Sequence, residues 1–330
     1  MTTPDSTTGL TLPSIPITQQ GLVASGPGTL RLATDLVIPT LDPEQVLVKA
    51  VAVALNPADF KLLDQSTTVG AISGSDVAGV IVKVGRNVRK PLKVGDRVCG
   101  VIFGSNPACP SNGAHAEYVA LLSDQCLRIP STMSFEAASS MGMGVTTVGL
   151  AFRSLGLSFP VAKEIQPTSG PTRPYVLVYG GATATGTIAI QSLRLAGYLP
   201  VTTCSPSSFD RVKELGAVAA FDYHLTNCKG EIRAYTGGRL AYALDCIGNS
   251  STMLICYGAI GDAGGRYVAL EAYPERLKLR RRDVKPDWVL GWTVFGKVVE
   301  LAGKYRREPS EVDRRYAAEW IERLEPLLDQ

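Results

Sequence analysis

The order of hydrophobic and polar positions divides the chain into two halves of different character. In the first half, β-type runs of branched and small residues at 44–55, 76–85, 93–103 and 113–121 predict strands. Residues 134–156 are mostly apolar after a Ser-x-Glu start, and they predict two helices. We therefore expect a mostly β unit that is followed by a short helical segment.

In the second half, apolar runs alternate with helical segments. The runs are YVLVYG, LPVTTCS, AAFDY, YALDCIG and RYVALEAY, all between residues 175 and 273. Near-continuous apolar strands separated by helices are typical of parallel strands that are covered on both faces. The pattern predicts an α/β fold in which the second unit is a doubly wound parallel sheet.

The tail of the chain predicts an amphipathic helix. Ser310 is placed to cap this helix, with Asp313 three residues on. The residues expected on its apolar face are Val312, Tyr316, Trp320 and Leu324.

The length of 330 residues exceeds the ~100 to 200 residues that are usual for one domain, so we expect two domains. A Pro- and polar-rich segment at 158–174 predicts the linker between them. We assign residues 1–157 together with 310–330 to a substrate domain, and residues 158–309 to a cofactor-binding domain.

Composition and charge exclude several classes of function. Hydrophobic residues at 45% and charged residues at 19% are ordinary for a globular protein. A formal charge of +3 is too small to indicate binding to nucleic acid or to an anionic membrane. The basic run RLKLRRRD at 276–283 is either a solvated loop or a docking patch for an acidic partner. No apolar stretch approaches the ~20 residues that span a bilayer.

The amino-terminal sequence MTTPDSTTGLTLP has no secretory or transit pattern, so we expect a cytoplasmic protein. The seven cysteines are an odd number and are scattered, which predicts reduced thiols. The only histidines are His115 and His224, and there is no C-x-x-C spacing. With so few ligands available, we expect no metal site.

The segment VYGGATATG at 178–186 has the layout of a nucleotide-binding turn, with a strand before it and a helix after it. Gly180 and Gly181 suit the turn, and Gly186 would let the helix pack close to the strand. Thr183 and Ala184 stand where the usual fingerprint has glycine, and the hydroxyls of Thr183 and Thr185 could donate to phosphate oxygens. The alternative is a plain strand-to-helix turn that binds nothing.

The end of the next strand bears on which cofactor would fit. An NAD site usually has an acidic residue there for the adenine ribose, but TTCSPSSFDRVK ends its strand without an acid. The hydroxyls and the cation that instead suit a 2′-phosphate are Ser205, Ser207, Ser208 and Lys213. This favours NADPH over NADH, although Lys213 is equally consistent with an ordinary solvated lysine.

Five segments in this order resemble the medium-chain dehydrogenase/reductase superfamily. They are ALNPADFKLL (54–63), GSDVAGVIVKVGRNV (74–88), KVGDRVCG (93–100), GAHAEYVAL (113–121) and YGGATATGTIAIQ (179–191). The resemblance implies a GroES-like, mostly β substrate domain and a Rossmann domain that binds the cofactor. Because Ser75 and Asp76 replace the His-Glu pair of the zinc alcohol dehydrogenases, the resemblance is to the zinc-free enoyl and quinone reductases.

Within that branch, NPADFK, VYGGATATG, CSPSSFD and AIGDAGGRYVALE resemble the fungal trans-acting enoyl reductases of highly reducing polyketide synthases, the lovastatin type. This resemblance implies a monomeric, NADPH-dependent enzyme. It implies reduction of the α,β double bond of a polyketide thioester, which the acyl carrier domain of a partner synthase holds.

The resemblance also implies roles for single residues. Lys61 of NPADFK would lie at the junction of cofactor and substrate, and Thr146 of GMGVTTVGLA would touch the nicotinamide. Their alternatives are a solvated lysine and a helix hydroxyl that bonds to its own backbone. The residues implied near the adenosine and the nicotinamide are Tyr223, Ile247, Gly248 and Leu270, whereas His115 is expected to serve structure.

One departure from the family concerns the carboxyl-terminal part. The family's first domain is completed by strands after the tail helix, and the sequence stops at Gln330, so we expect a shortened substrate domain. Two other functions stay open, and the short carboxyl-terminal part favours the second of them. One is a quinone or enone reductase that acts on free substrates. The other is a non-reducing, cofactor-bound member that acts as an auxiliary or polyketide-shaping protein.

Overall fold

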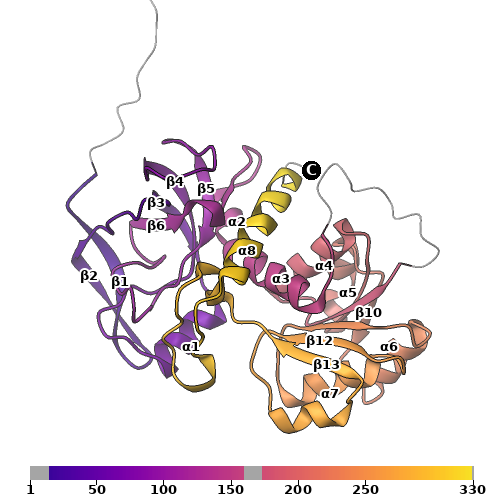
Figure 1. Ribbon diagram of the computed structural model, residues 1–330. Helices are drawn as coiled ribbons and strands as arrows, with labels where there is room; N and C mark the ends of the chain where they lie inside the picture. Colours follow the sequence, from indigo (N-terminus) through magenta and orange to yellow (C-terminus); the bar gives the residue numbers. More distant parts are fainter. Residues whose placement is uncertain (1–14, 160–172, 329–330) are drawn as a thin grey trace, which may run out of the picture.

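A computed structural model of the protein describes residues 15–159 and 173–328. The amino-terminal segment interpreted above for targeting lies outside the described residues, as does most of the predicted linker at 158–174. The model shows a β-rich half and a parallel-sheet half, with helices between them (Figure 1). The predicted domain bounds stay a prediction.

The β-rich half is built on an antiparallel sheet of five strands. In spatial order these are β6 (Tyr118–Leu122), β3 (Gln45–Ala54), β4 (Asp76–Val84), β5 (Arg97–Val101) and β7 (Cys126–Arg128). The predicted strands at 44–55, 76–85 and 93–103 are confirmed, whereas only the end of the run at 113–121 is a strand. Valines and isoleucines such as Val46, Val48 and Ile81 fill its core.

Three strands of this half were missed by the sequence interpretation. β1 (Thr18–Gly26) and β2 (Thr29–Val37) form a separate antiparallel hairpin, and β7 is very short. Most positions of β2 are exposed, so the strand lacks the apolar alternation that marks a half-buried strand.

The β-rich half also contains α-helices, and two of them line the cleft that is described below. α1 (Pro57–Gln65) follows β3, and α2 (Phe135–Ser139) and α3 (Gly142–Leu155) are the two helices predicted at 134–156. The backbone N–H of Asn56 donates to the Asp59 carboxylate at 2.8 Å and so supports the first turn of α1. α3 ends at Gly156, whose φ of +68° is the left-handed conformation that glycine adopts without strain.

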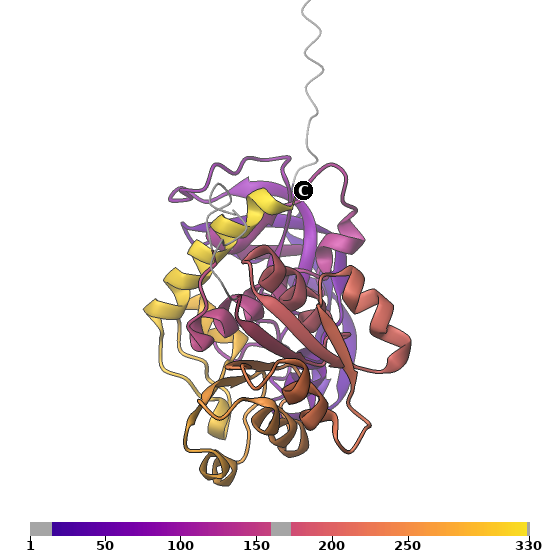
Figure 2. The same ribbon diagram turned by 90° about the vertical axis from the view of Figure 1, so that its right-hand side faces the viewer.

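The second half is a six-stranded parallel sheet in the order β10-β9-β8-β11-β12-β13. The strands are β8 (Tyr175–Tyr179), β9 (Leu199–Cys204), β10 (Ala219–Asp222), β11 (Tyr242–Asp245), β12 (Gly265–Ala269) and β13 (Val284–Trp288). The helices are α4 (Ala184–Leu195), α5 (Phe209–Glu214), α6 (Cys228–Tyr235) and α7 (Ser250–Ala259), and they cover both faces (Figure 2). The predicted doubly wound sheet is therefore confirmed.

The sequence interpretation found five of these strands and missed β13. Its sequence, VKPDW, contains a proline and two charges and does not look like a buried strand. Pro286 is tolerated because β13 lies at the edge of the sheet, where one side of the strand needs no ladder partner. The chain order reverses between β8 and β11, and such a reversal marks the ligand-binding crevice of doubly wound folds.

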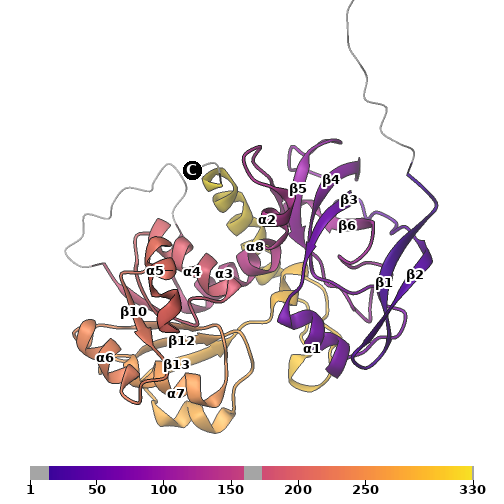
Figure 3. The same ribbon diagram turned by 180° about the vertical axis from the view of Figure 1, so that it is seen from behind.

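The predicted tail helix is α8 (Glu311–Leu324), which lies along α3 between the two halves (Figures 1 and 3). Its cap is confirmed, since the Ser310 hydroxyl accepts from the Asp313 N–H at 3.1 Å. The predicted apolar face is partly wrong, because Val312 is 48% exposed. The buried stripe is Ala317, Trp320, Ile321 and Leu324. Trp320 packs so close to Gly149 of α3 that a Cβ there would lie 2.8 Å from its ring.

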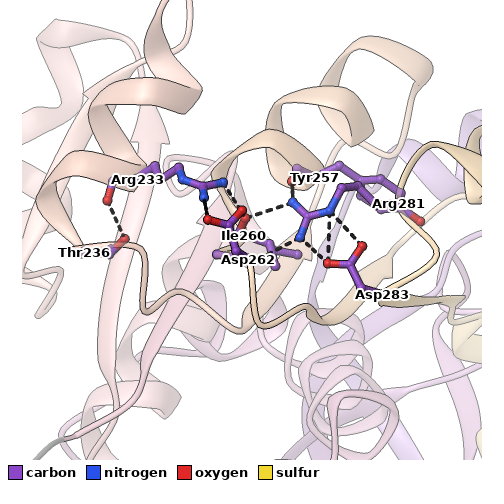
Figure 4. Close-up of polar contacts among 8 residues, drawn as sticks. Arg233, Thr236, Tyr257, Ile260, Asp262, Arg281 and Asp283 are labelled. Atoms are coloured by element: carbon purple, nitrogen blue, oxygen red, sulfur yellow. Dashed lines mark hydrogen bonds and ion pairs between the residues drawn. The ribbon is translucent and has the colours of Figure 1, made fainter.

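Arg281 of the basic run has a structural role (Figure 4). Its guanidinium donates to the carbonyls of Tyr257 and Ile260 at 3.0 Å and of Gly261 at 2.7 Å, and it pairs with Asp283. These carbonyls lie in the last turn of α7 and just after it. The last turn of a helix leaves backbone carbonyls without partners inside the helix, and Arg281 supplies donors to them. Arg281 is thus neither a solvated loop residue nor a docking residue. Arg276, Arg280 and Arg282 are exposed.

No helix in the described parts of the chain has both the length and the apolar character that crossing a membrane requires.

Candidate active site

A cleft of about 220 Å³ opens where the two halves meet, beside the carboxyl ends of β11 and β12. The β-rich half contributes Asn56, Pro57, Lys61, Leu62, Met143 and Thr147, the parallel-sheet half contributes Thr185, Cys246, Leu270, Glu271 and Trp288, and the following segment contributes Trp292, Leu301 and Tyr305. The loop around residue 300 lies beside α1 in Figures 1 and 3. Most of this lining is apolar, and a few polar groups converge on it.

Lys61 is held at this cleft by an ion pair. Its Nζ lies 2.6 Å from Oε2 of Glu271, which follows β12. The same carboxylate accepts from the Ala272 N–H at 2.9 Å and from the Tyr305 hydroxyl. Burial alone would raise the pKa of Glu271, but the hydrogen bonds from Lys61 and Tyr305 hold this pKa below its ordinary value. Glu271 therefore stays ionised, and the ammonium of Lys61 is held by an ion pair although the Lys61 side chain is 52% exposed.

Of the two neighbouring threonines on α3, the structure brings Thr147 to the cleft and not the predicted Thr146. Adjacent helix residues point about 100° apart, so only one of them can face the cleft. Thr146 is 2% exposed, and within the described residues its Oγ1 has no hydrogen-bond partner. The Thr146 hydroxyl also makes no hydrogen bond to the backbone of α3, so the alternative interpretation of Thr146 is not supported.

The glycines of the loop after β8 are required by close packing. A Cβ on Gly181 would lie 1.9 Å from Thr202 Oγ1, and one on Gly186 would lie 2.3 Å from the Gly180 carbonyl oxygen. Gly180 itself has a φ of +82°. The predicted tight turn and the close approach of helix to strand at Gly186 are therefore confirmed.

The Thr183 hydroxyl bonds within the chain in this structure, and the phosphate contact predicted for it stays a prediction. This hydroxyl donates to the Gly180 carbonyl at 2.8 Å and accepts from the Gly186 N–H at 3.0 Å, so it caps α4 and its single proton is already used. The backbone N–H groups of Ala184 and Thr185 lie in the first turn of α4, where donors have no intrahelical partner. Thr185 also lines the cleft. This turn can hold an anion through its backbone.

A second cavity, of about 590 Å³, lies beside the same loop at the reversal of strand order. It brings together Gly180, Thr183, Ser205, Tyr223 and Ile247 of the predicted cofactor residues. The Ser205 and Tyr223 hydroxyls are 3.3 Å apart, and the lining contains no acidic side chain from the end of β9. We call it the adenosine-side cavity.

Three of the predicted 2′-phosphate ligands do not line this cavity. Ser207, Ser208 and Lys213 lie on the turn and helix that follow Ser205, and Lys213 is exposed with its Nζ 5.9 Å from the centroid of the Phe209 ring. Their assignment to NADPH stays a prediction.

Asp245, which the sequence interpretation missed, shapes the loop that carries Ile247 and Gly248. Its Oδ1 accepts from the backbone N–H groups of Ile247 and Gly248 at 3.0 and 2.9 Å. Its Oδ2 accepts from Thr252 and Tyr267 at 2.6 and 2.9 Å. Burial raises the pKa of Asp245, and these bonds oppose the rise. The only sequence signal was an acid at the end of a buried strand.

A second missed feature is the buried carboxyl of Asp76, which ties α1 to α3. It accepts hydrogen bonds from Asn56 Nδ2 at 2.9 Å and from the Met143 N–H at 2.6 Å. Asn56 and Met143 both line the cleft. Burial raises the pKa of Asp76 to about 7. Asp76 therefore positions two cleft walls.

His115 lies away from the cleft and from the adenosine-side cavity. Its Nδ1 is 2.9 Å from Ser73 Oγ, and a Cβ on Gly74 would meet its ring at 2.4 Å. Burial lowers its pKa. Among the described residues, no group of three or more His, Cys, Asp and Glu is placed to hold a metal ion.

Comparisons with known proteins agree with this fold. Residues 42–131 match the alcohol dehydrogenase GroES-like domain, and residues 184–296 match the zinc-binding dehydrogenase family. The chain is similar to the trans-enoyl reductase caaB of Aspergillus niger, at 48% identity over 96% of this chain and 88% of that protein. It is also similar to the trans-enoyl reductase traG of Penicillium crustosum, at 45% identity over 96% and 88%.

Among solved structures, the CurK enoyl reductase has a TM-score of 0.67 at 21% identity, over 83% of this chain and 81% of that one. This likeness concerns the fold alone. The identities of 45% and 48% over nearly the whole chain carry the assignment to a family. The chain belongs to the fungal trans-enoyl reductases, within the medium-chain dehydrogenase/reductase superfamily.

Proposed function

We propose that this protein is an NADPH-dependent enoyl reductase that acts in trans on a polyketide thioester carried by the acyl carrier domain of a partner synthase. The observation that carries the proposal is the cleft, where Lys61, Thr147 and the first turn of α4 at Thr185 meet around an apolar lining. The names of the relatives support the reaction class.

The residues present fit a dinucleotide. The cradle at Gly181 and Gly186 has no room for a Cβ, and the turn that follows offers the backbone donors of Ala184 and Thr185 to a pyrophosphate. The adenosine-side cavity would take the adenosine, with Ile247 in its lining and Gly248 next to it in the chain. Leu270 and Thr147 line the cleft and would border the nicotinamide, Thr147 in the place first predicted for Thr146.

The proposed preference for NADPH depends on the end of β9. The hydroxyls of Ser205 and Tyr223 face the adenosine-side cavity, and the strand ends at Cys204 without a carboxylate to hold the ribose hydroxyls of NADH. The carboxylate at the end of β10, Asp222, is engaged by the N–H and Nδ1 of His224 at 3.0 and 2.7 Å. Lys213, which does not line this cavity, would add a positive charge farther from it.

The chemistry proposed for the chain is positioning and charge stabilisation. When bound, the reduced nicotinamide supplies the hydride for the β-carbon of the substrate. Lys61 donates one ammonium N–H to Glu271, and its other N–H groups would donate to the thioester oxygen, where negative charge develops. The apolar walls of the cleft would lower the local dielectric around this oxygen and strengthen the interaction. Solvent supplies the proton for the α-carbon.

An assay that follows NADPH absorbance tests the proposal. We expect oxidation of NADPH with a crotonyl or tetraketide thioester and none with a quinone. Turnover of the quinone alone would instead assign a reductase of free substrates. Tight binding of NADPH without oxidation by either substrate would assign a non-reducing auxiliary role.

The carrier part of the proposal has its own test. The same tetraketide is presented on an isolated acyl carrier domain and on a short pantetheine analogue. We expect a lower KM for the carrier-bound form, because contacts with the carrier domain add to binding. Equal KM values would contradict the proposed recognition of a carrier.

A further inference from the structure

A smaller pocket of about 80 Å³ lies next to the cleft and shares a lining residue with it. Of the described residues that line the cleft, only Trp292 also lines this pocket. The pocket is also lined by the apolar residues Ile102, Phe103, Leu122 and Phe295 and by polar residues that include Gln45, Asn106 and Asn112. We call it the distal pocket. Trp292 thus borders both of these largely apolar spaces.

Trp292 is held firmly in this position. Its ring stacks on Phe103 with centroids 4.5 Å apart and planes 5° from parallel, and its side chain is 4% exposed. It belongs to a buried apolar cluster with Leu62, Met143 and Leu301, three residues that pack around the cleft. Stacked and buried on these sides, the indole does not swing aside without disrupting its neighbours.

We propose that Trp292 is the residue that sets the length of acyl chain accepted by this enzyme, an inference that rests on the proposed function. With the reacting double bond beside Lys61, the apolar tail of a thioester runs along Leu62 and Leu301 and ends against the indole. The distal pocket next to it would bury further methylene groups if this side chain were smaller. Trp292 therefore favours short acyl chains by denying longer ones this apolar surface.

The test compares crotonyl and dodecenoyl thioesters in the wild type and in Trp292→Leu, which keeps an apolar side chain in the cluster. Each methylene that reaches an apolar site contributes about 0.8 kcal/mol, so burial of two or more predicts a gain of about tenfold in the ratio of kcat/KM for dodecenoyl over crotonyl. An unchanged ratio in a folded Trp292→Leu protein would overturn the proposal.

Two further variants control for general damage to the site. Trp288→Leu removes a tryptophan that lines the cleft but not the distal pocket, so it should change kcat/KM for both thioesters alike. Adding Phe295→Trp to Trp292→Leu fills the distal pocket from its other wall, and it should reverse the gain for dodecenoyl. If Trp288→Leu changed the ratio of kcat/KM for dodecenoyl over crotonyl as much as Trp292→Leu does, Trp292 would have no special role in chain-length selection.

Failure of the proposed function is distinguishable from failure of this inference. Calorimetric binding of butyryl and lauroyl thioesters to the same proteins needs no turnover. Trp292→Leu should strengthen lauroyl binding relative to butyryl binding even if no substrate is reduced. Equal changes for both ligands would contradict the inference alone.

Discussion

The ammonium of Lys61 lies 2.6 Å from the carboxylate of Glu271, and this pair joins α1 of the β-rich half to the end of β12 in the parallel sheet. The two residues are 210 positions apart in the chain. Because Tyr305 donates to the same carboxylate, three separate segments meet at Glu271. The pair fixes the position of the Lys61 ammonium at the cleft and connects the two halves there.

Replacing Lys61 by alanine should therefore impair catalysis. We expect Lys61→Ala to lower kcat for a crotonyl thioester by about a hundredfold, the usual cost of losing one donor to a developing oxyanion. Lys304→Ala is the matched control, because Lys304 is 4.0 Å from the same carboxylate but does not line the cleft. Turnover by Lys61→Ala that equals the control would disprove the proposed role.

The two threonines of α3 should respond differently to the same change. Thr147→Val is expected to reduce kcat/KM, since Thr147 lines the cleft. Thr146→Val should leave kcat/KM unchanged and raise the free energy of unfolding by about 1 kcal/mol, because it removes a buried hydroxyl that has no partner in the described structure. Steady-state rates and urea denaturation measure the two effects. The reverse order of activity losses would restore Thr146 as the nicotinamide contact.

The buried carboxyl of Asp76 predicts a pH dependence of stability. Its pKa is raised from 3.8 to about 7 in the folded protein, so between these values the folded state holds a proton that the unfolded state has released. The contribution of Asp76 to the free energy of unfolding therefore falls as pH rises through this window, and it is constant above it.

Asp76→Asn should remove that dependence, because asparagine cannot ionise and its Oδ1 can still accept from the Met143 N–H. We expect the unfolding free energy of the variant, relative to the wild type, to rise between pH 4 and pH 7. Urea titrations across that range measure the difference. A difference that does not change with pH would show that Asp76 does not titrate there.

The cofactor preference gives a further prediction. Ser205→Ala should weaken NADPH binding by about tenfold, the cost of one hydrogen bond to a charged group, and should leave NADH binding nearly unchanged. Lys213→Ala measures separately whether the exposed cation contributes. Fluorescence titrations with both cofactors provide the comparison. Thr187→Ala on α4 is the control, because the Thr187 hydroxyl donates to the Ala184 carbonyl at 2.8 Å and Thr187 lines neither cavity. An equal loss for both cofactors from Ser205→Ala would refute the 2′-phosphate assignment.

Much of the fold follows from local sequence. The parallel sheet could be predicted because strands that are covered on both faces have sequences that are nearly continuous apolar runs. The Ser310 cap could be predicted because its hydrogen bond joins residues only three positions apart. The glycine loop could be predicted because close packing excludes a Cβ at Gly181 and Gly186. β13 was missed because an edge strand tolerates a proline and two charges.

The candidate site needed the tertiary structure. Nothing local distinguishes Thr146 from Thr147, because only the rotation of α3 against its neighbours decides which hydroxyl faces the cleft. Nor does local sequence predict that Thr183 uses its hydroxyl to cap α4, or that Glu271 pairs with Lys61. The sequence by itself determined five strands of the parallel sheet, the glycine turn and the family. Only the packing of the two halves decided which polar groups converge, since contacts between distant segments depend on the whole fold.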